Sequence, residues 1–195
     1  MSYPHNHPFD LLADWLKAAH AGEPNDANAV YLATVGPDGQ PSLRTVLLKG
    51  LDARGPVFYT NMRSRKGQEM AGHDKVALLF HWKSLERQVR IEGVVNQVSD
   101  GEADAYFASR RRGSQIGAHA SLQSQPLSAP KALAARVQEM EAHFEGQDVP
   151  RPPHWSGMRL TAHRFEFWQS GEFRLHEREV LTRDGDGWVG QYLYP

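Results

Sequence analysis

Apolar residues recur at intervals of three and four between Pro8 and Gly22, as they do on one face of a helix. The apolar positions are Phe9, Leu12, Leu16 and Ala19. Proline near the start and glycine just past the end fit the usual boundaries of a helix. We therefore expect an amphipathic helix over residues 8–22. Residues 1–7 are polar, and we expect them to form a disordered, frayed end.

Beyond Gly22 the apolar pattern changes to alternation, which is typical of strands. Residues 29–35 and 40–50 predict two strands joined by the turn GPDG (36–39). The other predicted strands are 56–60, 75–82, 85–99, 158–170, 172–182 and 187–194, with a turn at DGDG (184–187). Helical patterns over 100–112 and 129–146 separate the early strands from the late ones.

This order of elements predicts the α+β class, with a meander of antiparallel strands that closes into a barrel and carries flanking helices. Strands do not alternate regularly with helices, so a doubly wound parallel sheet is disfavoured. No repeat, low-complexity tract or glycine-rich linker interrupts the chain, and we expect a single domain over residues 1–195.

Composition excludes or disfavours several kinds of partner and site. Lys and Arg total 22 against 23 Asp and Glu, so the net charge of −1 disfavours nucleic acid as a partner. The absence of cysteine excludes disulfides, thiolate metal sites and a cysteine nucleophile. No histidine pair with metal-ligand spacing stands beside a carboxylate, so no metal is expected. With no long apolar run and no signal-peptide pattern, we expect a cytoplasmic protein that does not interact with membranes.

Four groups of basic and hydroxyl residues are candidates for anion binding. RSRKG (63–67) follows a predicted strand and precedes a short helical stretch, so Arg65, Lys66 and the hydroxyls of Thr60 and Ser64 suit a phosphate at a helix start. By itself it is more typical of a solvated basic turn than of a phosphate site.

RTVLLKG (44–50) places two cations in one strand. An odd separation puts Arg44 and Lys49 on opposite faces of a regular strand, so one ligand contacts both only at a bulge or a strand end. Otherwise they are two strand-edge cations.

In FRLHER (173–178), strand periodicity predicts that Arg174, His176 and Arg178 share one face. Such a stripe either binds an anion or faces solvent, where neighbouring glutamates neutralise it.

Tyr106, Arg110 and Ser114 are four apart and share a helical face if the helix over 100–112 extends to Ser114. A phenol, a guanidinium and a hydroxyl together suit a phosphate monoester. Gly113 leaves that extension open.

The motifs RTVLLKG, VFYTNMRSRKG, LERQVRIEG, SQIGA and FEFWQSGEFRLHER, in this order, resemble the pyridoxamine/pyridoxine 5′-phosphate oxidase family over about residues 9–190. The resemblance implies a homodimer of FMN-binding split barrels that acts in vitamin B6 metabolism. Such an enzyme oxidises pyridoxamine 5′-phosphate or pyridoxine 5′-phosphate to pyridoxal 5′-phosphate and reduces O2 to H2O2.

The family's contacts fall on residues of these motifs. The implied FMN contacts are Arg44, Thr45, Val46, Leu47, Leu48, Lys49, Tyr59, Thr60, Ser64, Arg65, Lys66, Gln88, Gln123, Ser124, Trp168 and Arg178. The implied substrate contacts are Lys49, Tyr106, Arg110, Ser114, Arg174, Leu175 and His176. Arg174 is expected over the substrate ring and His176 at the ring substituents, which makes these two the expected catalytic residues.

The chain departs from the family pattern in three places. It begins too late to include the longer basic N-terminal arm that folds over the substrate, so we expect an altered lid. It ends in YLYP (192–195) instead of an Arg-Leu-x-Pro type sequence, and His119 stands where an apolar or aromatic residue is usual.

Two alternatives stay open. A flavin oxidase of secondary metabolism, such as a phenazine-type relative, is expected to keep the FMN residues but lack the combined substrate set. A non-catalytic protein that binds FMN or pyridoxal phosphate is the other. Oxygen uptake with pyridoxamine 5′-phosphate distinguishes them.

Overall fold

The computed structural model of the chain describes residues 7–195. Its helices are α1 (Pro8–Gly22), α2 (Arg65–Gly72), α3 (Asp100–Ala108), α4 (Arg112–Ala120) and α5 (Pro130–His143), with a 3-10 turn η1 (Glu172–Arg174). Its strands are β1 (Ala29–Val35), β2 (Pro41–Asp52), β3 (Gly55–Asn61), β4 (Lys75–Trp82), β5 (Arg87–Gln97), β6 (Trp155–Gln169), β7 (Glu177–Asp184) and β8 (Gly187–Tyr192).

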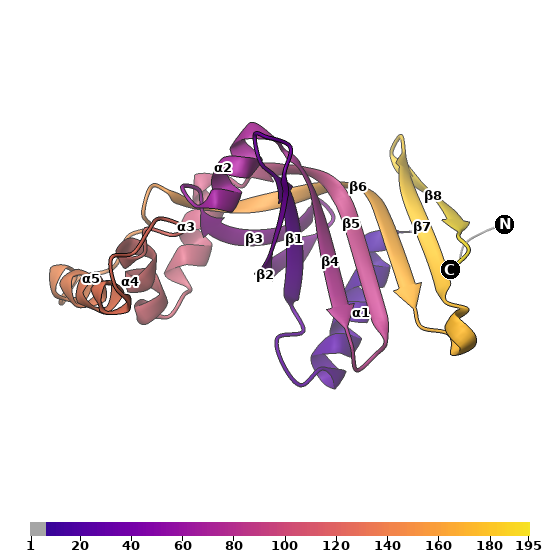
Figure 1. The fold of residues 1–195 in the computed structure, drawn as a ribbon, viewed down its shortest axis with the longest axis horizontal. Helices are drawn as coiled ribbons and strands as arrows, with labels where there is room; N and C mark the ends of the chain where they lie inside the picture. Colours follow the sequence, from indigo (N-terminus) through magenta and orange to yellow (C-terminus); the bar gives the residue numbers. More distant parts are fainter. Residues whose placement is uncertain (1–6) are drawn as a thin grey trace.

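The strands form one antiparallel sheet in the order β3-β2-β1-β4-β5-β6-β7-β8, and an additional pairing of β3 with β6 closes the first six into a barrel (Figure 1). β6 is long enough to serve both parts. Its first residues, Trp155–Arg159, pair with β3, and its last, Arg164–Gln169, pair with β7. β7 and β8 therefore extend from the barrel as a hairpin. The expected α+β barrel with flanking helices is confirmed.

The barrel interior holds the main hydrophobic core. Fully buried side chains from β1, β4, β5 and β6 meet there, among them Leu32, Phe80, Ile91 and Phe165. α1 packs against this core through the face that its periodicity predicts, with the Phe9 ring 5.1 Å from that of Phe165. Burial of these apolar surfaces is what holds the helix in place, since an isolated helix of this length is marginal in water.

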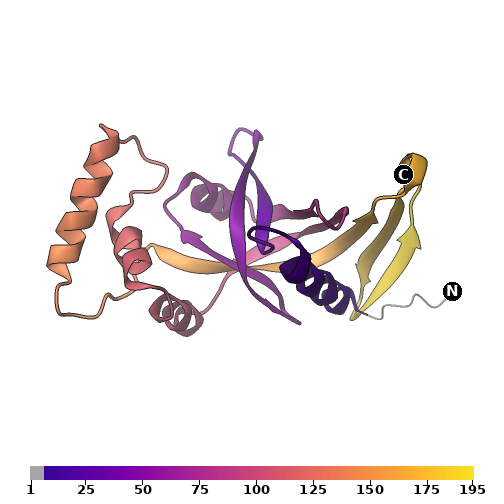
Figure 2. The same cartoon turned by 90° about the horizontal axis from the view of Figure 1, so that it is seen from below.

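A smaller core holds the helices that flank the cavity described below. Phe107 of α3, Ile116 of α4 and Phe144 after α5 pack around Trp155, the first residue of β6. Figure 2 shows these helices at one end of the molecule, with the β7–β8 hairpin at the other.

Two predicted elements are wrong. The helix over 100–112 ends at Ala108, and a second helix begins at Arg112. The strand over 172–182 begins only at Glu177, because Phe173 and Arg174 have φ angles of 55° and 65° and form the turn η1. Positive φ angles are incompatible with a regular strand, so the stripe of Arg174, His176 and Arg178 does not form.

Of the predicted frayed end over residues 1–7, the structure describes only His7. Residues 1–6 lie outside the described residues. His7, which we expected to be frayed, lies with its ring 5.3 Å from that of Phe9. Among residues 7–195, no helix combines the length and the apolar character that crossing a bilayer requires.

Candidate active site

A cavity of about 470 Å³ lies where β2, β3 and the start of β6 meet α2, α3 and α4. Many predicted site residues line it: Thr45, Val46, Leu47, Lys49, Tyr59, Thr60, Lys66, Tyr106, Arg110, Ser114 and Gln123. Its wall also contains residues that the sequence did not single out: Asn61, Gly117, Ala118, Ser121 and Trp155.

Lys66 occupies one part of the cavity, in the first turn of α2. Its Nζ donates to Thr60 Oγ1 at 3.1 Å, Ser64 Oγ at 3.2 Å and Gln123 Oε1 at 3.1 Å. Burial, assisted by the positive charge of Arg44, lowers the pKa of Lys66. Ser64 caps α2 by accepting from the Gly67 N–H. These uncharged partners leave the ammonium available to an anion at a helix N-terminus.

The last residue of the RSRKG motif, Gly67, is required by the shape of the backbone. A Cβ at this position would lie 2.3 Å from the carbonyl oxygen of Met62. Only glycine therefore allows the chain to turn so tightly from β3 into α2, which brings Lys66 back over Thr60.

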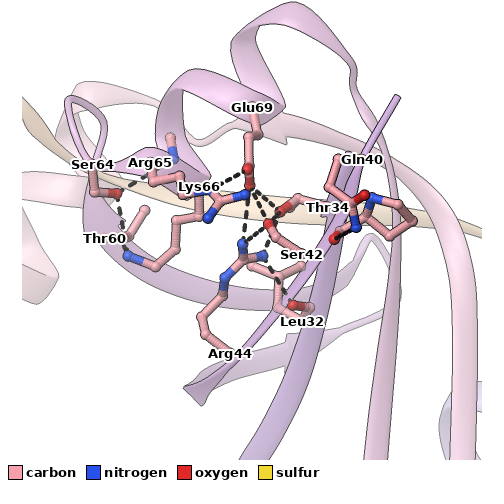
Figure 3. A network of polar contacts seen from close by, with 12 residues as sticks. Leu32, Thr34, Gln40, Ser42, Arg44, Thr60, Ser64, Arg65, Lys66 and Glu69 are labelled. Atoms are coloured by element: carbon pink, nitrogen blue, oxygen red, sulfur yellow. Dashed lines mark hydrogen bonds and ion pairs between the residues drawn. The ribbon is translucent and has the colours of Figure 1, made fainter. Parts of the chain in front are cut away.

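Arg44 and Arg65 are held by a carboxylate that the sequence analysis missed. Glu69 of α2 is 5% exposed and accepts from Arg44 Nη2 at 3.0 Å and Arg65 Nε at 2.8 Å (Figure 3). Thr34 and Ser42 also donate to it, at 2.5 and 2.7 Å. The guanidinium of Arg44 further donates to the Leu32 carbonyl and contacts both hydroxyls. Arg44 therefore connects α2 to β1 and β2, and it does not line the cavity.

The surroundings of Glu69 decide its protonation. Burial alone would raise its pKa, but hydrogen bonds from Thr34, Ser42 and Arg65 and the charge of Arg44 outweigh burial and lower the pKa to about 2. Because the folded pKa lies below the usual value of 4.5, the ionised network stabilises the fold above that pH. This stabilisation is lost as the pH falls toward 2.

We expect Glu69→Gln to lower the free energy of unfolding at pH 7 by about 3 kcal/mol, since each pKa unit corresponds to about 1.4 kcal/mol. The difference from the parent should shrink steadily between pH 5 and pH 2 as the parent's Glu69 is protonated. Urea unfolding at several pH values and equal protein concentration measures it. Glu145→Gln, at an exposed position, is the matched control. A difference that stays constant with pH would contradict the assignment.

Lys49, Tyr106, Arg110 and Ser114 converge on another part of the cavity. The register between β2 and β3 shifts between Leu48 and Gly50, so Lys49 lies at a bulge. A bulge re-aims a side chain, and Lys49 lines the cavity while Arg44 lies outside it. Tyr106 belongs to α3, Arg110 follows its end and Ser114 belongs to α4. The break between the helices, and not a shared helical face, brings these three together.

The cavity is electropositive. Its lining includes Lys49, Lys66 and Arg110 and no carboxylate. Arg110 Nη1 is buried without a hydrogen-bond partner among residues 7–195, and burial lowers the pKa of this guanidinium. Burial likewise raises the pKa of Tyr106, which keeps the phenol protonated as a donor. Such a site favours anionic ligands.

Six of the other predicted residues form a second group on β5, β6, β7 and the turn before β7: Gln88, Trp168, Arg174, Leu175, His176 and Arg178. In the strand register Gln88 lies beside Trp168, and Trp168 beside Arg178. The His176 ring lies 4.6 Å from that of Trp168, and its Nδ1 accepts from the Gly171 N–H at 3.3 Å. Arg174 and Leu175 are exposed in the turn.

Arg178 is fixed by Glu166, a second buried carboxylate that the sequence analysis missed. Arg178 donates to Glu166 Oε1 from Nε at 3.0 Å and Nη2 at 2.7 Å. Arg90 and Arg164 also pair with Glu166. Burial would raise the pKa of Glu166, but these three arginines outweigh burial and lower it. Arg178 also donates to the Tyr194 carbonyl at 2.9 Å, so the unusual C-terminal YLYP segment is attached to this group.

The predicted residues that line the cavity and the second group do not meet within one chain. None of the second group lines the cavity, and the two lie on different sides of the barrel, near α3 and α4 and near β7 respectively (Figure 1). Like Arg44, four further predicted residues lie outside the cavity lining, among them Arg65, which pairs with Glu69. Leu48 is buried in the barrel core, Ser64 is buried as the cap of α2, and Ser124 has φ 71° in an exposed loop.

His119 has a structural partner. Its Nε2 lies 2.7 Å from the Pro150 carbonyl oxygen, and its ring lies 4.8 Å from that of Phe144. The ring therefore fills an apolar position of α4 while its polar atom is satisfied.

Another hollow, of about 680 Å³, lies beside the end of α5. It is lined by Arg112 but also by Glu141, Glu145 and Asp148. Three carboxylates against one cation disfavour a phosphate there. Within residues 7–195, no three histidine, aspartate or glutamate side chains converge as a metal site would require.

Comparisons with known sequences all point to the same family. The sequence model described as pyridoxamine 5′-phosphate oxidase matches residues 16–144, and the model described as the pyridoxine 5′-phosphate oxidase C-terminal dimerisation region matches residues 155–195. A pyridoxine/pyridoxamine 5′-phosphate oxidase from Sphingopyxis alaskensis is 59% identical over 96% of this chain and 87% of its own length. One of the same name from Myxococcus xanthus is 55% identical, over 96% of this chain and 91% of its own.

Solved structures agree with this result. PhzG from Burkholderia lata, solved with tetrahydrophenazine-1-carboxylic acid, superposes with a TM-score of 0.93 at 34% identity, over 98% of this chain and 94% of its own. A pyridoxamine 5′-phosphate oxidase-related, FMN-binding protein from Nostoc punctiforme shares the fold with a TM-score of 0.76 at 16% identity, over 95% and 96% of the two chains. Sequence, barrel and cavity together show that the chain belongs to the pyridoxamine 5′-phosphate oxidase family.

Proposed function

We propose that the protein is an FMN-dependent oxidase that converts pyridoxamine 5′-phosphate or pyridoxine 5′-phosphate to pyridoxal 5′-phosphate, with O2 reduced to H2O2. One observation carries this: a single cavity without carboxylates holds two sets of phosphate donors that share no hydrogen-bond partner. Lys66 and Thr60 form one set. Lys49, Tyr106, Arg110 and Ser114 form the other. The activity requires two phosphates, one on the flavin and one on the vitamer.

The chemistry of the first set fits FMN. A lysine in the first turn of a helix, whose ammonium is hydrogen-bonded to the hydroxyls of Thr60 and Ser64, suits a terminal phosphate monoester. Val46 and Leu47, which are neighbours on β2, also line this cavity and extend it along the strand beyond the first set. When bound, the flavin would be the two-electron acceptor for oxidation at C4′ of the vitamer, and O2 would reoxidise it.

The second set anchors the vitamer. Arg110 and Lys49 pair with its phosphate, while Tyr106 and Ser114 donate to it. Holding the phosphate at one end fixes the position of C4′ at the other, which is how binding lowers the entropic part of the barrier.

The remaining role belongs to Arg174, Leu175 and His176. We assign Arg174 to the face of the substrate ring and His176 to its polar substituents. Because these residues and the flavin contacts Gln88, Trp168 and Arg178 lie away from the cavity of their own chain, the complete site needs a second subunit. The matched dimerisation region, residues 155–195, contains most of this group. We therefore propose a homodimer in which each cavity is completed by the partner's second group.

Oxygen uptake tests the activity directly. With FMN saturating, addition of pyridoxamine 5′-phosphate or pyridoxine 5′-phosphate should consume O2 and release H2O2 and pyridoxal 5′-phosphate. Unphosphorylated pyridoxamine is the matched control and should react poorly, since it cannot use the second donor set. Binding without turnover would identify a non-catalytic FMN or pyridoxal phosphate protein instead.

The phenazine-type alternative draws support from the similarity to PhzG at 34% identity. The named oxidases are closer in sequence, at 54–59%. The vitamer donor set favours a phosphorylated substrate. Turnover of tetrahydrophenazine-1-carboxylic acid without turnover of the vitamer phosphates would reverse the assignment.

We expect the flavin released from the denatured protein to be FMN. The donors around Lys66 match a single terminal phosphate, and chromatography of the released flavin identifies it. Lys66→Ala should lower the flavin content of the purified protein, whereas Lys131→Ala, at an exposed position of α5, should not. Recovery of FAD would contradict the proposal.

A further inference from the structure

Arg110 is held by aromatic rings and not by a carboxylate. Its guanidinium carbon lies 4.7 Å from the centre of the Trp155 ring and 5.4 Å from that of Phe107. Within residues 7–195 it forms no ion pair of 4.0 Å or less, and its Nη1 is buried without a hydrogen-bond partner. This contrasts with Arg44, Arg65 and Arg178, each of which is bound to a buried glutamate.

Trp155 is itself fixed firmly. It is 7% exposed, and its ring stacks at 5.3 Å and 12° on that of Tyr59, with Tyr106 nearly parallel at 6.1 Å and 7°. The Phe107 ring meets it edge-on at 5.0 Å. Its backbone pairs with Asn61 of β3, and its carbonyl accepts from Arg151 Nη1 at 2.8 Å. The indole is therefore a rigid surface joined to the barrel.

We propose that Trp155 is a positioning residue for the oxidase reaction: its indole face orients the guanidinium of Arg110 toward the vitamer phosphate and leaves the positive charge of Arg110 uncompensated. The role deepens the proposed function and rests on it for the identity of the anion. The electrostatic attraction of a cation to a ring face orients the cation without neutralising it. A carboxylate in the same place would compete with the phosphate for the guanidinium.

The aromatic rings stacked beside Trp155 are consistent with such a role. Tyr59 and Tyr106 stack at 3.9 Å and 19° beside Trp155 and present phenols to the same cavity. The stack thus joins a phosphate donor, Tyr106, to the ring that orients a second donor, Arg110. Both donors are placed by one rigid aromatic unit.

Binding of 4-deoxypyridoxine 5′-phosphate, which lacks the group to be oxidised, tests the proposal on the FMN-loaded protein. Trp155→Leu should raise the calorimetric Kd between about two- and thirtyfold, the range expected when a cation–π contact is lost. Trp155→Phe should retain most of the affinity. Phe144→Leu, which removes a ring of the same core that lies outside the cavity lining, is the control for packing. Unphosphorylated 4-deoxypyridoxine should bind all variants alike.

Site-specific replacement of Trp155 by mono-, di- and trifluorotryptophan keeps the shape and weakens the ring face stepwise. The Kd for the phosphorylated ligand should rise with each fluorine. The proposal is overturned if fluorination leaves the Kd unchanged, or if Phe144→Leu weakens binding as much as Trp155→Leu does. If the parent consumes no O2 with the vitamer phosphates but the Kd still follows fluorination, the proposed function fails and the positioning role stands.

Discussion

Arg110→Ala is expected to weaken binding of pyridoxine 5′-phosphate by about ten- to a hundredfold while the affinity for FMN hardly changes. A hydrogen bond to a charged group contributes about 1.5–3 kcal/mol, and each 1.4 kcal/mol corresponds to about tenfold in affinity. Among residues 7–195, Arg110 has no carboxylate partner whose loss would disturb the fold. The KM for the vitamer phosphate, measured with FMN saturating, and the Kd for FMN provide the two readouts.

Lys66→Ala is the reciprocal variant. It should loosen FMN and leave the KM of the vitamer phosphate near the parent value once FMN is saturating, because Lys66 and Arg110 share no side-chain partner in the described part of the chain. If Arg110→Ala mainly releases FMN, the assignment of the two donor sets is wrong.

Mixing two impaired variants should restore activity if the site is shared between subunits, when activity is measured at a vitamer concentration well below the KM of Arg110→Ala. Arg110→Ala damages the cavity, and Arg174→Ala damages the second group. In a heterodimer of the two, one site carries both substitutions and the other carries neither. A 1:1 mixture that exchanges subunits freely forms heterodimers for half of its dimers, so about a quarter of all sites should be intact. Oxygen uptake of the mixture should therefore reach about a quarter of the parent rate.

The control is a mixture of Arg110→Ala with Lys49→Ala, two substitutions in the same cavity. In their heterodimer each cavity still carries one substitution, so mixing should not restore activity. Sedimentation of the parent should show a species near twice 21.9 kDa. At equal total protein, a rate no higher than the mean of the two residual rates in the Arg110→Ala and Arg174→Ala mixture would place the whole site within one chain.

Local patterns predicted most of the secondary structure. The predicted bounds 29–35 and 75–82 are those of β1 and β4, and 8–22 is the range of α1. In each segment the regularly spaced apolar residues lie on the face that becomes buried. The segment's own sequence is therefore enough to predict its secondary structure.

The turn before β7 could not be predicted in this way. A Cβ on Gly171 would lie 2.1 Å from the Leu175 carbonyl oxygen, so the chain folds back tightly on itself here. The positive φ angles of Phe173 and Arg174 accompany this close approach. The alternating residue types suggested a strand, but a tight backbone turn overrode that preference, as tertiary context often does.

The sequence by itself identified the candidate phosphate-binding residues and, through the resemblance, the family and its expected activity. Only the tertiary structure decided how these residues are used. Arg44 pairs with Glu69, 25 residues away along the chain, and so stabilises α2 instead of lining the cavity. Tyr106, Arg110 and Ser114 converge across a break between two helices. Which distant residues become partners depends on the packing of the whole barrel and on the need to pair buried charges. A local sequence pattern contains no information on either.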